Sequence, residues 1–485
     1  MPMAPVSLLI HISRSIIKCA IALEKSRSGM RPELLMVEIA DVAMNNTRDP
    51  TAQAFARRWL LRAAWTAAIL IETGLAASVS QAWAQAQQTA QTIAQPAATS
   101  PSEQARLRVF EEVWQTVRDR FYDRNLRGLD WEGVRNRYRP LVAAARNEQN
   151  RARLINGMLG ELRASHTEYY TPDEQAYYEL LGIFAGPLHT RLESMFPNGE
   201  IAYVGIGAYA RPLGGKIFTT GVLGGLPAER AGLRVGDEIL DVDGKPYQAI
   251  GSFRGKAGQS VTLHIRRRAN GPIEALSVTP QIIHPTEAFF AAMEHSARVI
   301  QKDGLRIGYI HIWSYASFAY QRLLLRELQS GVLKDAQGLI LDLRDGWGGA
   351  ELDYLQPFTG RLPAMSVIGR DGEERFENVR WGRPVAMLVN AGTRSGKEIL
   401  ADAFERYGLG PVVGSHTAKA VLGARAFLMS DGSLLLLAVA DVIIDGRRLE
   451  GVGVEPTIAV PFRIEYADGR DPQLDKAISI LAGSL

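Results

Sequence analysis

Hydrophobic residues recur at three- and four-residue spacing in the part of the chain that follows residue 101. The first such run consists of Leu107, Phe110, Trp114, Val117 and Phe121. A second run consists of Leu154, Ile155, Met158, Leu159 and Leu162. This spacing places the apolar side chains on one face of a helix. The pattern therefore predicts a helical N-terminal domain over residues 102–197.

The pattern changes to short alternating segments split by glycines over residues 202–283. In the stretch SVTLHIRRR, the residues Val261, Leu263 and Ile265 alternate with polar residues, as in a strand with one buried face. A short helix is expected near 227–231, followed by a hairpin in VGDEILDVDGKPY. These features predict a small β domain.

Apolar runs and helical patterns alternate after residue 284. GLILDLRD and VAMLVN are nearly continuous apolar runs, which are typical of strands buried on both faces. RIGYIHIW reads as another strand, and FAYQRLLLRELQSGVL as a helix. We expect a layered α/β domain over 290–463 and a C-terminal tail over 464–485. The predicted fold class is thus α+β and multidomain.

Composition adds few constraints. The chain has 485 residues, 46% of them hydrophobic, and a net charge of +3, so nothing points to nucleic acid as a partner. The only cysteine is Cys19, which excludes an intrachain disulfide and a site with several cysteine ligands.

The N-terminal region has the order of features that an export signal requires. Arg57, Arg58 and Arg62 precede an apolar run over 63–77, and an Ala-Trp-Ala sequence ends at Ala84. We expect a signal peptide over 44–84, cleavage after Ala84, and a periplasmic protein. An uncleaved segment would instead anchor the chain to the membrane.

The segments on either side of this signal are also assigned. Residues 1–43 precede a plausible start at Met44 and are interpreted as an over-extended gene start. Residues 85–101 are rich in Gln, Ala, Thr and Pro and are expected to form a disordered tether.

Ser395 stands in NAGTRSGKE, between an apolar strand and a helical pattern. A serine in this position caps the helix, or it is a nucleophile held at the helix N-terminus. A nucleophilic serine needs a general base and donors for the oxyanion. Candidate donors are the N–H groups of Gly396, Gly348 and Gly349, with the last two expected at the start of a helix.

Two residues compete for the role of the base. His166 follows Ser165 at the end of a predicted helix, and Lys419 lies in GSHTAKAVLG. The residues alone leave both open.

Several motifs resemble known families. PAERAGLRVGDEIL resembles a PDZ domain over 202–283. GELRASHT, DLRDGWGG, NAGTRSGKE and LEGVGVEP, in this order, resemble the tail-specific (C-terminal processing) and tricorn-core serine peptidases. The resemblance implies a crotonase-like α/β spiral core and endopeptidase activity without a metal or organic cofactor. The PDZ resemblance implies capture of an extended peptide, with Gly205, Ile206, Gly207 and Ala208 as the loop that binds its carboxylate.

The family resemblance also distinguishes between the two candidates for the general base. The processing branch has a lysine at the end of a T-x-G-K motif, where this chain has Ala420; Lys419 falls one position early. The tricorn-like branch has counterparts to Ser165, His166, Ser395 and Glu450. The resemblance therefore implies Ser395 as nucleophile and His166 as base, with Ser165 and Glu450 orienting the imidazole.

The expected function is that of a periplasmic serine endopeptidase acting on proteins or peptides, with their extended or C-terminal segments bound by the PDZ domain. The alternative is a non-catalytic scaffold of the same fold that binds peptides or other ligands.

Overall fold

The computed structural model describes residues 102–485, except 197–199, 362, 364, 371 and 373. The predicted gene start, signal peptide and tether, over 1–101, lie outside the described residues. None of the described helices has the length and apolar character needed to cross a bilayer.

The described residues contain both α-helices and 3-10 helices. They are α5 (Glu103–Arg120), η1 (Leu126–Gly128), α6 (Trp131–Ala143), α7 (Glu148–Gly160), α8 (Gln175–Ile183), α9 (Ala185–Met195), α10 (Pro227–Arg230), α11 (Pro285–Ser296), α12 (Phe318–Gln329), η3 (Leu352–Leu355), α13 (Gln356–Thr359), α14 (Gly396–Arg406) and α15 (Pro472–Ser484). Side chains cap several of them: the Ser102 hydroxyl, for example, accepts a hydrogen bond from the Ala105 N–H at the start of α5.

The strands form several separate sheets. They are β1 (Glu168–Tyr170), β2 (Tyr203–Gly205), β3 (Ala208–Leu213), β4 (Lys216–Val222), β5 (Glu238–Val242), β6 (Val261–Arg266), β7 (Glu274–Val278), β8 (Gln281–Ile283), β9 (Arg298–Lys302), β10 (Leu305–His311), β11 (Gly338–Asp342), β12 (Met365–Ile368), β13 (Glu374–Asn378), β14 (Val385–Val389), β15 (Val412–Gly414), β16 (Gly423–Leu428), β17 (Leu434–Ala440), β18 (Ile443–Ile444), β19 (Arg447–Arg448) and β20 (Ile458–Ala459).

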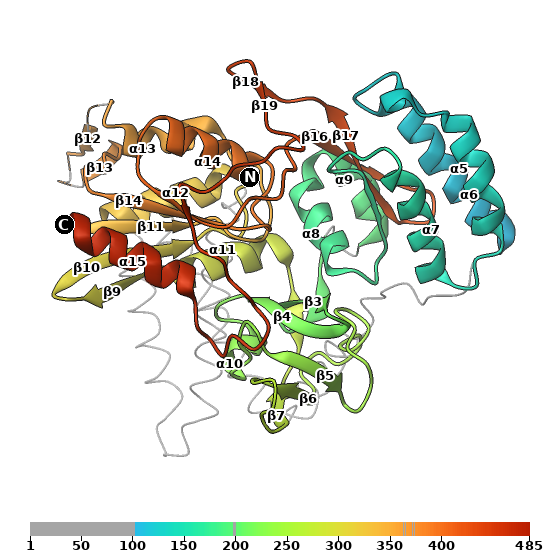
Figure 1. Ribbon diagram of the computed structural model, residues 1–485, viewed down its shortest axis with the longest axis horizontal. Helices are drawn as coiled ribbons and strands as arrows, with labels where there is room; N and C mark the ends of the chain where they lie inside the picture. Colours follow the sequence, from blue (N-terminus) through green and yellow to red (C-terminus); the bar gives the residue numbers. More distant parts are fainter. Residues whose placement is uncertain (1–101, 197–199, 362, 364, 371, 373) are drawn as a thin grey trace, which may run out of the picture. The chain divides into compact units, whose positions relative to one another are not determined.

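A six-stranded sheet lies at the centre of the α/β region, with strand order β20-β15-β14-β11-β10-β9 (Figure 1). Its neighbours pair in parallel, except that β9 is antiparallel to β10. Leu339 and Leu341 face one hydrophobic cluster, and Ile340 between them faces another. This alternation explains why the run GLILD is apolar throughout: both faces of the strand are buried.

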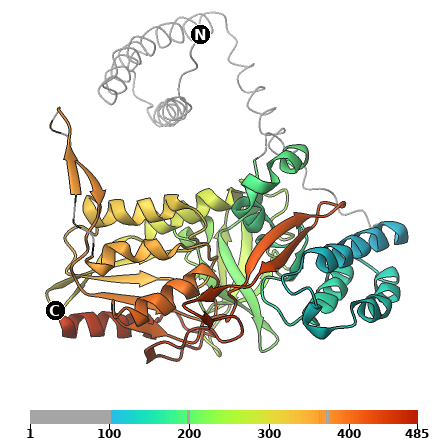
Figure 2. The ribbon, with the colours of Figure 1, turned by 90° about the horizontal axis from the view of Figure 1, so that it is seen from above.

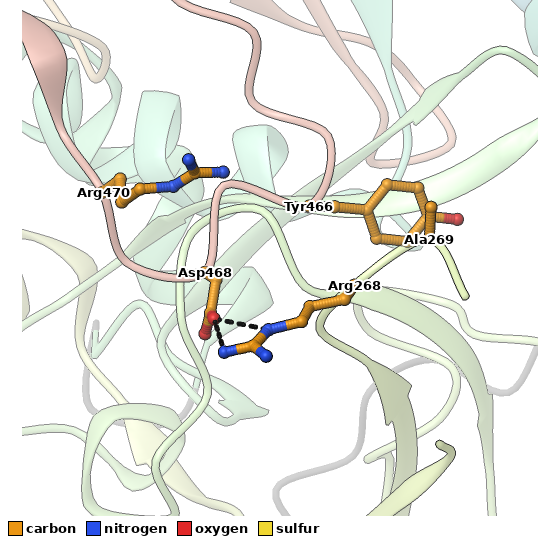
Figure 3. Close-up of a pocket in the computed structure, with 5 residues that line it drawn as sticks. All are labelled: Arg268, Ala269, Tyr466, Asp468 and Arg470. Atoms are coloured by element: carbon orange, nitrogen blue, oxygen red, sulfur yellow. Dashed lines mark hydrogen bonds and ion pairs between the residues drawn. The ribbon is translucent and has the colours of Figure 1, made fainter. Parts of the chain in front are cut away.

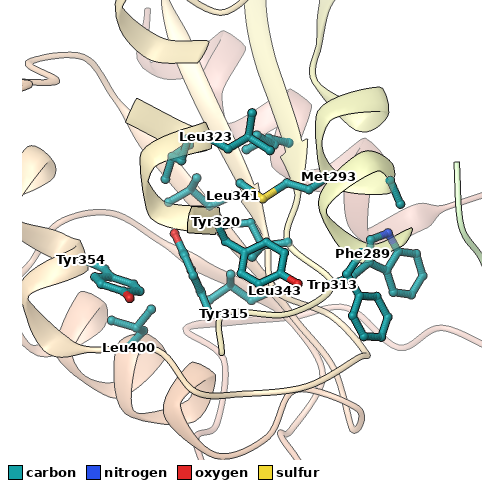
Figure 4. Packing of buried hydrophobic residues seen from close by; sticks show 14 of the residues in the cluster. Phe289, Met293, Trp313, Tyr315, Tyr320, Leu323, Leu341, Leu343, Tyr354 and Leu400 are labelled. Atoms are coloured by element: carbon teal, nitrogen blue, oxygen red, sulfur yellow. The ribbon is translucent and has the colours of Figure 1, made fainter. Parts of the chain in front are cut away.

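The larger cluster contains residues of α11, α12 and α14 together with one face of the sheet. Aromatic side chains concentrate in it, and Figure 4 shows Trp313, Tyr315, Tyr320 and Tyr354 among the aliphatic residues. The helix that follows Ser395 contributes Leu400, Ala401, Ala403 and Phe404 to this cluster.

The C-terminal tail expected over 464–485 requires correction. Helix α15 lies on the second face of the sheet, where Ala477 and Leu481 are buried against Ile340 and Leu388 (Figures 1 and 2). Residues 474, 477, 478 and 481 form an apolar stripe at helical spacing. This stripe makes the helix an integral layer of the core.

The helical segment 102–197 is divided between two cores rather than forming one domain. Helices α5 to α7 pack with Leu435 and Leu437 of β17, whereas α8 and α9 join the cluster that holds Leu434 and Leu436. Strand β1 pairs with β17 antiparallel. The run of four leucines in β17 is explained by this position, because each face of the strand enters a different core.

The glycine-split segment forms a β domain, defined here as residues 203–283. Its main sheet has the order β3-β4-β5-β6-β7, with antiparallel neighbours, and β2 pairs with β8. Val261, Leu263 and Ile265 face its core as expected. Strand β3 lies at an edge of the sheet.

Candidate active site

Ser395 is the N-cap residue of α14 and has an unusual backbone conformation. Its φ is 58° and its ψ is −132°, a region that non-glycine residues occupy at a cost of about 1–3 kcal/mol. Its N–H donates to Ala420 O at 2.8 Å and faces the Glu398 carboxylate at 3.2 Å. Such strain, fixed from two sides, is typical of residues whose side chain must point in one functional direction.

Gly348 lies directly against the Ser395 turn. A Cβ on Gly348 would be 2.6 Å from Ser395 Cβ and 3.0 Å from Gly396 N. Likewise, a Cβ on Gly396 would be 2.4 Å from Ala350 N. Both positions therefore require glycine, because the two backbone segments touch.

The predicted oxyanion donors carry N–H groups without a protein acceptor. Among the described residues, no hydrogen bond is donated by the N–H of Gly348, Gly349 or Gly396. Gly348 and Gly396 lie beside Ser395. A Cβ on Gly349, by contrast, would be 2.5 Å from the α-carbon of Ala316, and the φ of Gly349 is 91°. This arrangement leaves donors available next to the serine.

One local expectation for these glycines is wrong. Gly348 and Gly349 do not begin a helix, because the next helical element, η3, starts only at Leu352. Instead, Trp347 forms a parallel bridge with Ser314, and Tyr315 N–H donates to Gly348 O at 3.1 Å. Backbone pairing to this neighbouring segment fixes the turn in place of a helix.

Ser165, His166 and Glu450 are brought together although Glu450 is 285 positions from Ser165. The Ser165 hydroxyl donates to Glu450 Oε2 at 2.7 Å and lies 2.9 Å from His166 Nδ1. The Ser165 N–H donates to Glu450 Oε1 at 2.9 Å.

These contacts determine the tautomer of the imidazole. A carboxylate only accepts hydrogen bonds, so the Ser165 proton points to Glu450 and its oxygen accepts from His166 Nδ1–H. The His166 Nε2 atom then carries the lone pair, as a general base requires.

The pKa of His166 is lowered from 6.5 to about 4. Burial is the largest cause, and the Arg394 guanidinium adds to it, while Glu450 acts in the opposite direction. The imidazole is therefore neutral at pH 7. Hydrogen bonds to two neighbouring residues link this group to the Ser395 turn: Glu450 Oε2 accepts from Val421 N–H, and Ala420 O accepts from Ser395 N–H, both at 2.8 Å.

Lys419 is exposed and contributes to the site through its backbone. Its N–H donates to Glu398 Oε1 at 2.8 Å, and its carbonyl accepts from Gly451 N–H at 3.0 Å. Its side chain runs along the loop at Gly453. The backbone of Lys419 thus helps to form the loop that contacts the Ser395 turn.

Glu398 was not predicted as a site residue but organises the Ser395 turn. Its buried carboxylate accepts hydrogen bonds from Ser395 N–H, Thr417 Oγ1, Lys419 N–H and Ala420 N–H. Burial raises its pKa. The signal available in the sequence was a glutamate three residues after a serine, which is the spacing of a capping box.

The predicted carboxylate loop over 205–208 is buried in this structure. The carbonyls of Ile206 and Gly207 accept from Ala228 N–H and Leu223 N–H, both at 2.8 Å. Just beyond the loop, Tyr209 of β3 stacks on Trp313, with ring centroids 5.7 Å apart. The loop thus lies where the β domain meets the peptidase-like core.

A pocket of about 440 Å³ is lined by Arg268, Ala269, Tyr466, Asp468 and Arg470 (Figure 3). It contains no predicted site residue. The segment 464–470 crosses the β domain here: Tyr466 N–H donates to Gly236 O at 2.9 Å, and Arg268 pairs with Asp468 at 2.8 Å. No group of three or more His, Cys, Asp or Glu among the described residues is arranged to hold a metal ion.

Comparison with known families places these features in context. Residues 306–460 match the model of peptidase family S41, residues 218–267 match the PDZ domain, and residues 102–160 match the tricorn protease C1 domain. Tricorn protease homolog 1 of Streptomyces coelicolor is 26% identical over 78% of this chain and 35% of its own length. The present chain thus spans about a third of that relative.

Two bacterial processing proteases are also similar. The carboxyl-terminal-processing protease of Synechocystis is 26% identical over 80% of this chain and 90% of its own length. The carboxy-terminal processing protease CtpB of Bacillus subtilis is 30% identical over 54% of this chain and 56% of its own length. The tricorn C1, PDZ and peptidase family S41 matches thus follow one another in this order along the chain.

Proposed function

We propose that this protein hydrolyses peptide bonds through an acyl-enzyme formed on Ser395. The observation that carries the proposal is the hydrogen-bonded set of Ser165, His166 and Glu450, which is linked to the strained Ser395 through the neighbouring residues Ala420 and Val421. A non-catalytic scaffold gives no reason for a strained serine together with a histidine whose tautomer is fixed by Ser165 and Glu450.

In the proposed reaction, each of these residues has one role. His166 Nε2 takes the proton of the Ser395 hydroxyl as its oxygen attacks the carbonyl carbon of the scissile peptide. The oxyanion that forms accepts hydrogen bonds from the N–H groups of Gly396 and Gly348. Ser165 and Glu450 stabilise the imidazolium.

In the rest of the reaction, His166 acts first as a general acid and then again as a general base. The C–N bond breaks as His166 gives its proton to the leaving amine. Water, deprotonated by His166, then attacks the ester carbonyl, and the acid product leaves with the serine hydroxyl restored.

Labelling and proteolysis test this proposal together. A fluorophosphonate probe should modify wild type and leave Ser395→Ala unmodified. Casein should be cleaved by wild type and by Lys419→Ala, but not by Ser395→Ala or His166→Ala. Activity in His166→Ala combined with its loss in Lys419→Ala would overturn the assignment of the base. Absence of both labelling and cleavage in wild type would favour the binding scaffold.

The PDZ domain is proposed to capture extended or C-terminal segments of protein substrates. The edge position of β3 supports this role, because an edge strand can accept one more strand. Fluorescent peptides with a free C-terminal carboxylate should bind more tightly than the same peptides ending in an amide. Equal affinity would exclude recognition of the carboxylate by residues 205–208.

We further propose that the protein works in the periplasm after cleavage following Ala84. Support for this location comes from the basic, apolar and small-residue order of the N-terminal sequence. Mass spectrometry of the protein recovered from the periplasmic fraction should give a chain beginning at Gln85. Recovery only in the cytoplasm, with an intact N-terminus, would contradict the proposal.

A further inference from the structure

Lys397 is a buried cation two residues after Ser395. Its side chain is fully buried, and its ammonium donates to Asp345 O at 2.8 Å and Trp313 O at 3.3 Å. Both partners are backbone carbonyls, and no carboxylate of the described residues forms an ion pair with it. A buried cation that only carbonyls satisfy is costly, so its position needs an explanation.

One carbonyl, that of Asp345, belongs to the turn that carries Gly348, namely residues 345–349, and the other, that of Trp313, belongs to the segment paired with this turn. Asp345 begins the turn, and Trp313 O also accepts from Trp347 N–H at 2.8 Å. Asp345 and Gly346 have φ values of 54° and 69°. A Cβ on Gly346 would be 1.9 Å from Trp313 O. The turn is therefore tightly wound around the atoms that Lys397 contacts.

Lys397 also belongs to the element that supplies the other oxyanion donor. The Gly396 N–H precedes it by one residue on α14, and the Gly348 N–H lies three residues after Asp345. One side chain thus connects the helix that carries the first donor to the turn that carries the second. Other residues also donate hydrogen bonds to the 345–349 turn. The hydrogen bond from the Lys397 ammonium to Asp345 O joins that turn directly to the N-terminal end of α14.

We propose that Lys397 is a positioning residue that fixes the distance between the Gly396 and Gly348 N–H groups in the oxyanion site. This inference rests on the proposed function and identifies what holds its oxyanion site together. Without the ammonium, the Asp345 and Trp313 carbonyls lose a shared donor and the 345–349 turn relaxes away from α14. As a result, the two N–H groups stabilise the oxyanion of the transition state less well, while the affinity for the uncleaved substrate stays the same.

Other charges surround the ammonium. Asp345 and Asp342 favour its charged form, and Arg394 and burial oppose it. His311, stacked on Trp313 with ring centroids 4.0 Å apart, is influenced by the lysine charge as well. None of these groups bridges α14 to the turn as the Lys397 ammonium does.

The test compares a tetrahedral ligand with a flat one. A dipeptidyl boronic acid forms a tetrahedral adduct with a catalytic serine, and the matching dipeptide carboxylic acid does not. In Lys397→Met, which keeps the length of the side chain, kcat on casein-derived peptides should fall about 10–100-fold with KM nearly unchanged. Affinity for the boronic acid should fall by a similar factor, and affinity for the carboxylic acid should remain.

Two further variants complete the design. Lys397→Gln keeps a donor on a shorter side chain and should lie between wild type and Lys397→Met. It replaces the methionine variant if that fails to fold by circular dichroism. Lys476→Met, on an exposed lysine of α15, should match wild type throughout.

The outcomes separate this inference from the proposed function. Wild-type kcat and boronic acid affinity in Lys397→Met would overturn the inference. Equal losses for the boronic acid and the carboxylic acid would do so too, because they indicate a purely structural lysine. If wild type itself is not labelled at Ser395 by a fluorophosphonate, the proposed function fails, and this inference fails with it.

Discussion

Ser395 and Glu450 are connected through two consecutive residues of one loop. The Ser395 N–H donates to Ala420 O at 2.8 Å, and the Glu450 carboxylate accepts from Val421 N–H at 2.8 Å. The loop thereby fixes the nucleophile's backbone and the carboxylate that orients Ser165 relative to each other. Three segments distant in sequence are joined with few contacts, so each contact should matter for activity.

Replacing Glu450 by glutamine should reduce kcat at pH 7 by about 100-fold or more. Glutamine offers a single acceptor oxygen, whereas the carboxylate accepts from Ser165 N–H, Ser165 Oγ and Val421 N–H. The amide NH₂ would face one of these donors, which should also lower the free energy of unfolding by about 1–3 kcal/mol. Steady-state kinetics and urea unfolding measure the two effects.

The control for this change is Glu455→Gln. Glu455 is exposed and contacts His416 at 2.8 Å on the surface, so activity and stability should stay within error of wild type. Full activity in Glu450→Gln would show that the carboxylate is not needed to orient Ser165 and His166.

Arg394 should set the pH dependence of the reaction. Only the neutral imidazole accepts the serine proton, so kcat/KM should fall as the pH drops through the pKa of His166, which is about 4. Arg394→Met removes a charge that lowers this pKa, and the acid limb of the profile should move to higher pH. The measurement is kcat/KM from pH 3.5 to 8.

Arg394→Lys serves as the charge-preserving control, and its acid limb should remain near that of wild type. The arginine also stacks over Trp347, 5.2 Å from the ring centroid, so both variants lose the same planar contact. An acid limb that does not move in the methionine variant would contradict the influence of Arg394 on His166.

Gly348→Ala should abolish most of the activity. Its Cβ would be 2.6 Å from Ser395 Cβ, so the turn and the serine must separate, and one oxyanion donor moves out of position. Removal of one such donor costs about 100- to 1000-fold in kcat.

Gly160→Ala is the control for Gly348→Ala, because it makes the same substitution at a position where an added Cβ has room. Gly160 ends α7, and a Cβ there meets no atom within 4 Å, so activity should be unchanged. Cleavage of casein at equal enzyme concentration compares the two. Comparable rates would mean that the 345–349 turn is not held against Ser395 during the reaction.

Local patterns in the sequence predicted the elements around Ser395 and missed contacts that depend on distant segments. β14 and α14 follow from an apolar run and a helical stripe, because each signal lies within one short segment. In the same helix, the burial of Lys397 and Glu398 could not be predicted. Their partners lie in the turn near residue 345 and the loop at 417–420, and only the fold brings these together.

The family motifs added the long-range information that local patterns lack. They pair Ser165 and His166 with Glu450 from the sequence alone, and the structure shows these residues in hydrogen-bonding contact. No family motif covers the C-terminal helix α15, and its apolar stripe consists of only residues 474, 477, 478 and 481. Residues 464–485 were therefore expected to be a tail, although α15 covers a face of the central sheet.

The buried ammonium of Lys397 should make stability depend on pH above neutrality. Burial lowers the pKa of Lys397 from 10.5 to about 7. Between these values the unfolded chain binds the proton that the folded protein has released. Unfolding therefore takes up a proton, and the free energy of unfolding rises with pH in this window by up to about 1.4 kcal/mol per pH unit.

Urea unfolding at intervals from pH 7 to 8.5 measures this dependence, far enough below the ordinary pKa of tyrosine, about 10, that the buried tyrosines with raised pKa values contribute little. Wild type should gain stability across the range, and Lys397→Met should gain clearly less because the titrating group is gone. Lys419→Met should keep the wild-type slope, since its lysine is exposed in the folded protein. His166, with a pKa of about 4, does not titrate in this range. Equal slopes in wild type and Lys397→Met would mean that the ammonium stays protonated in the folded protein throughout.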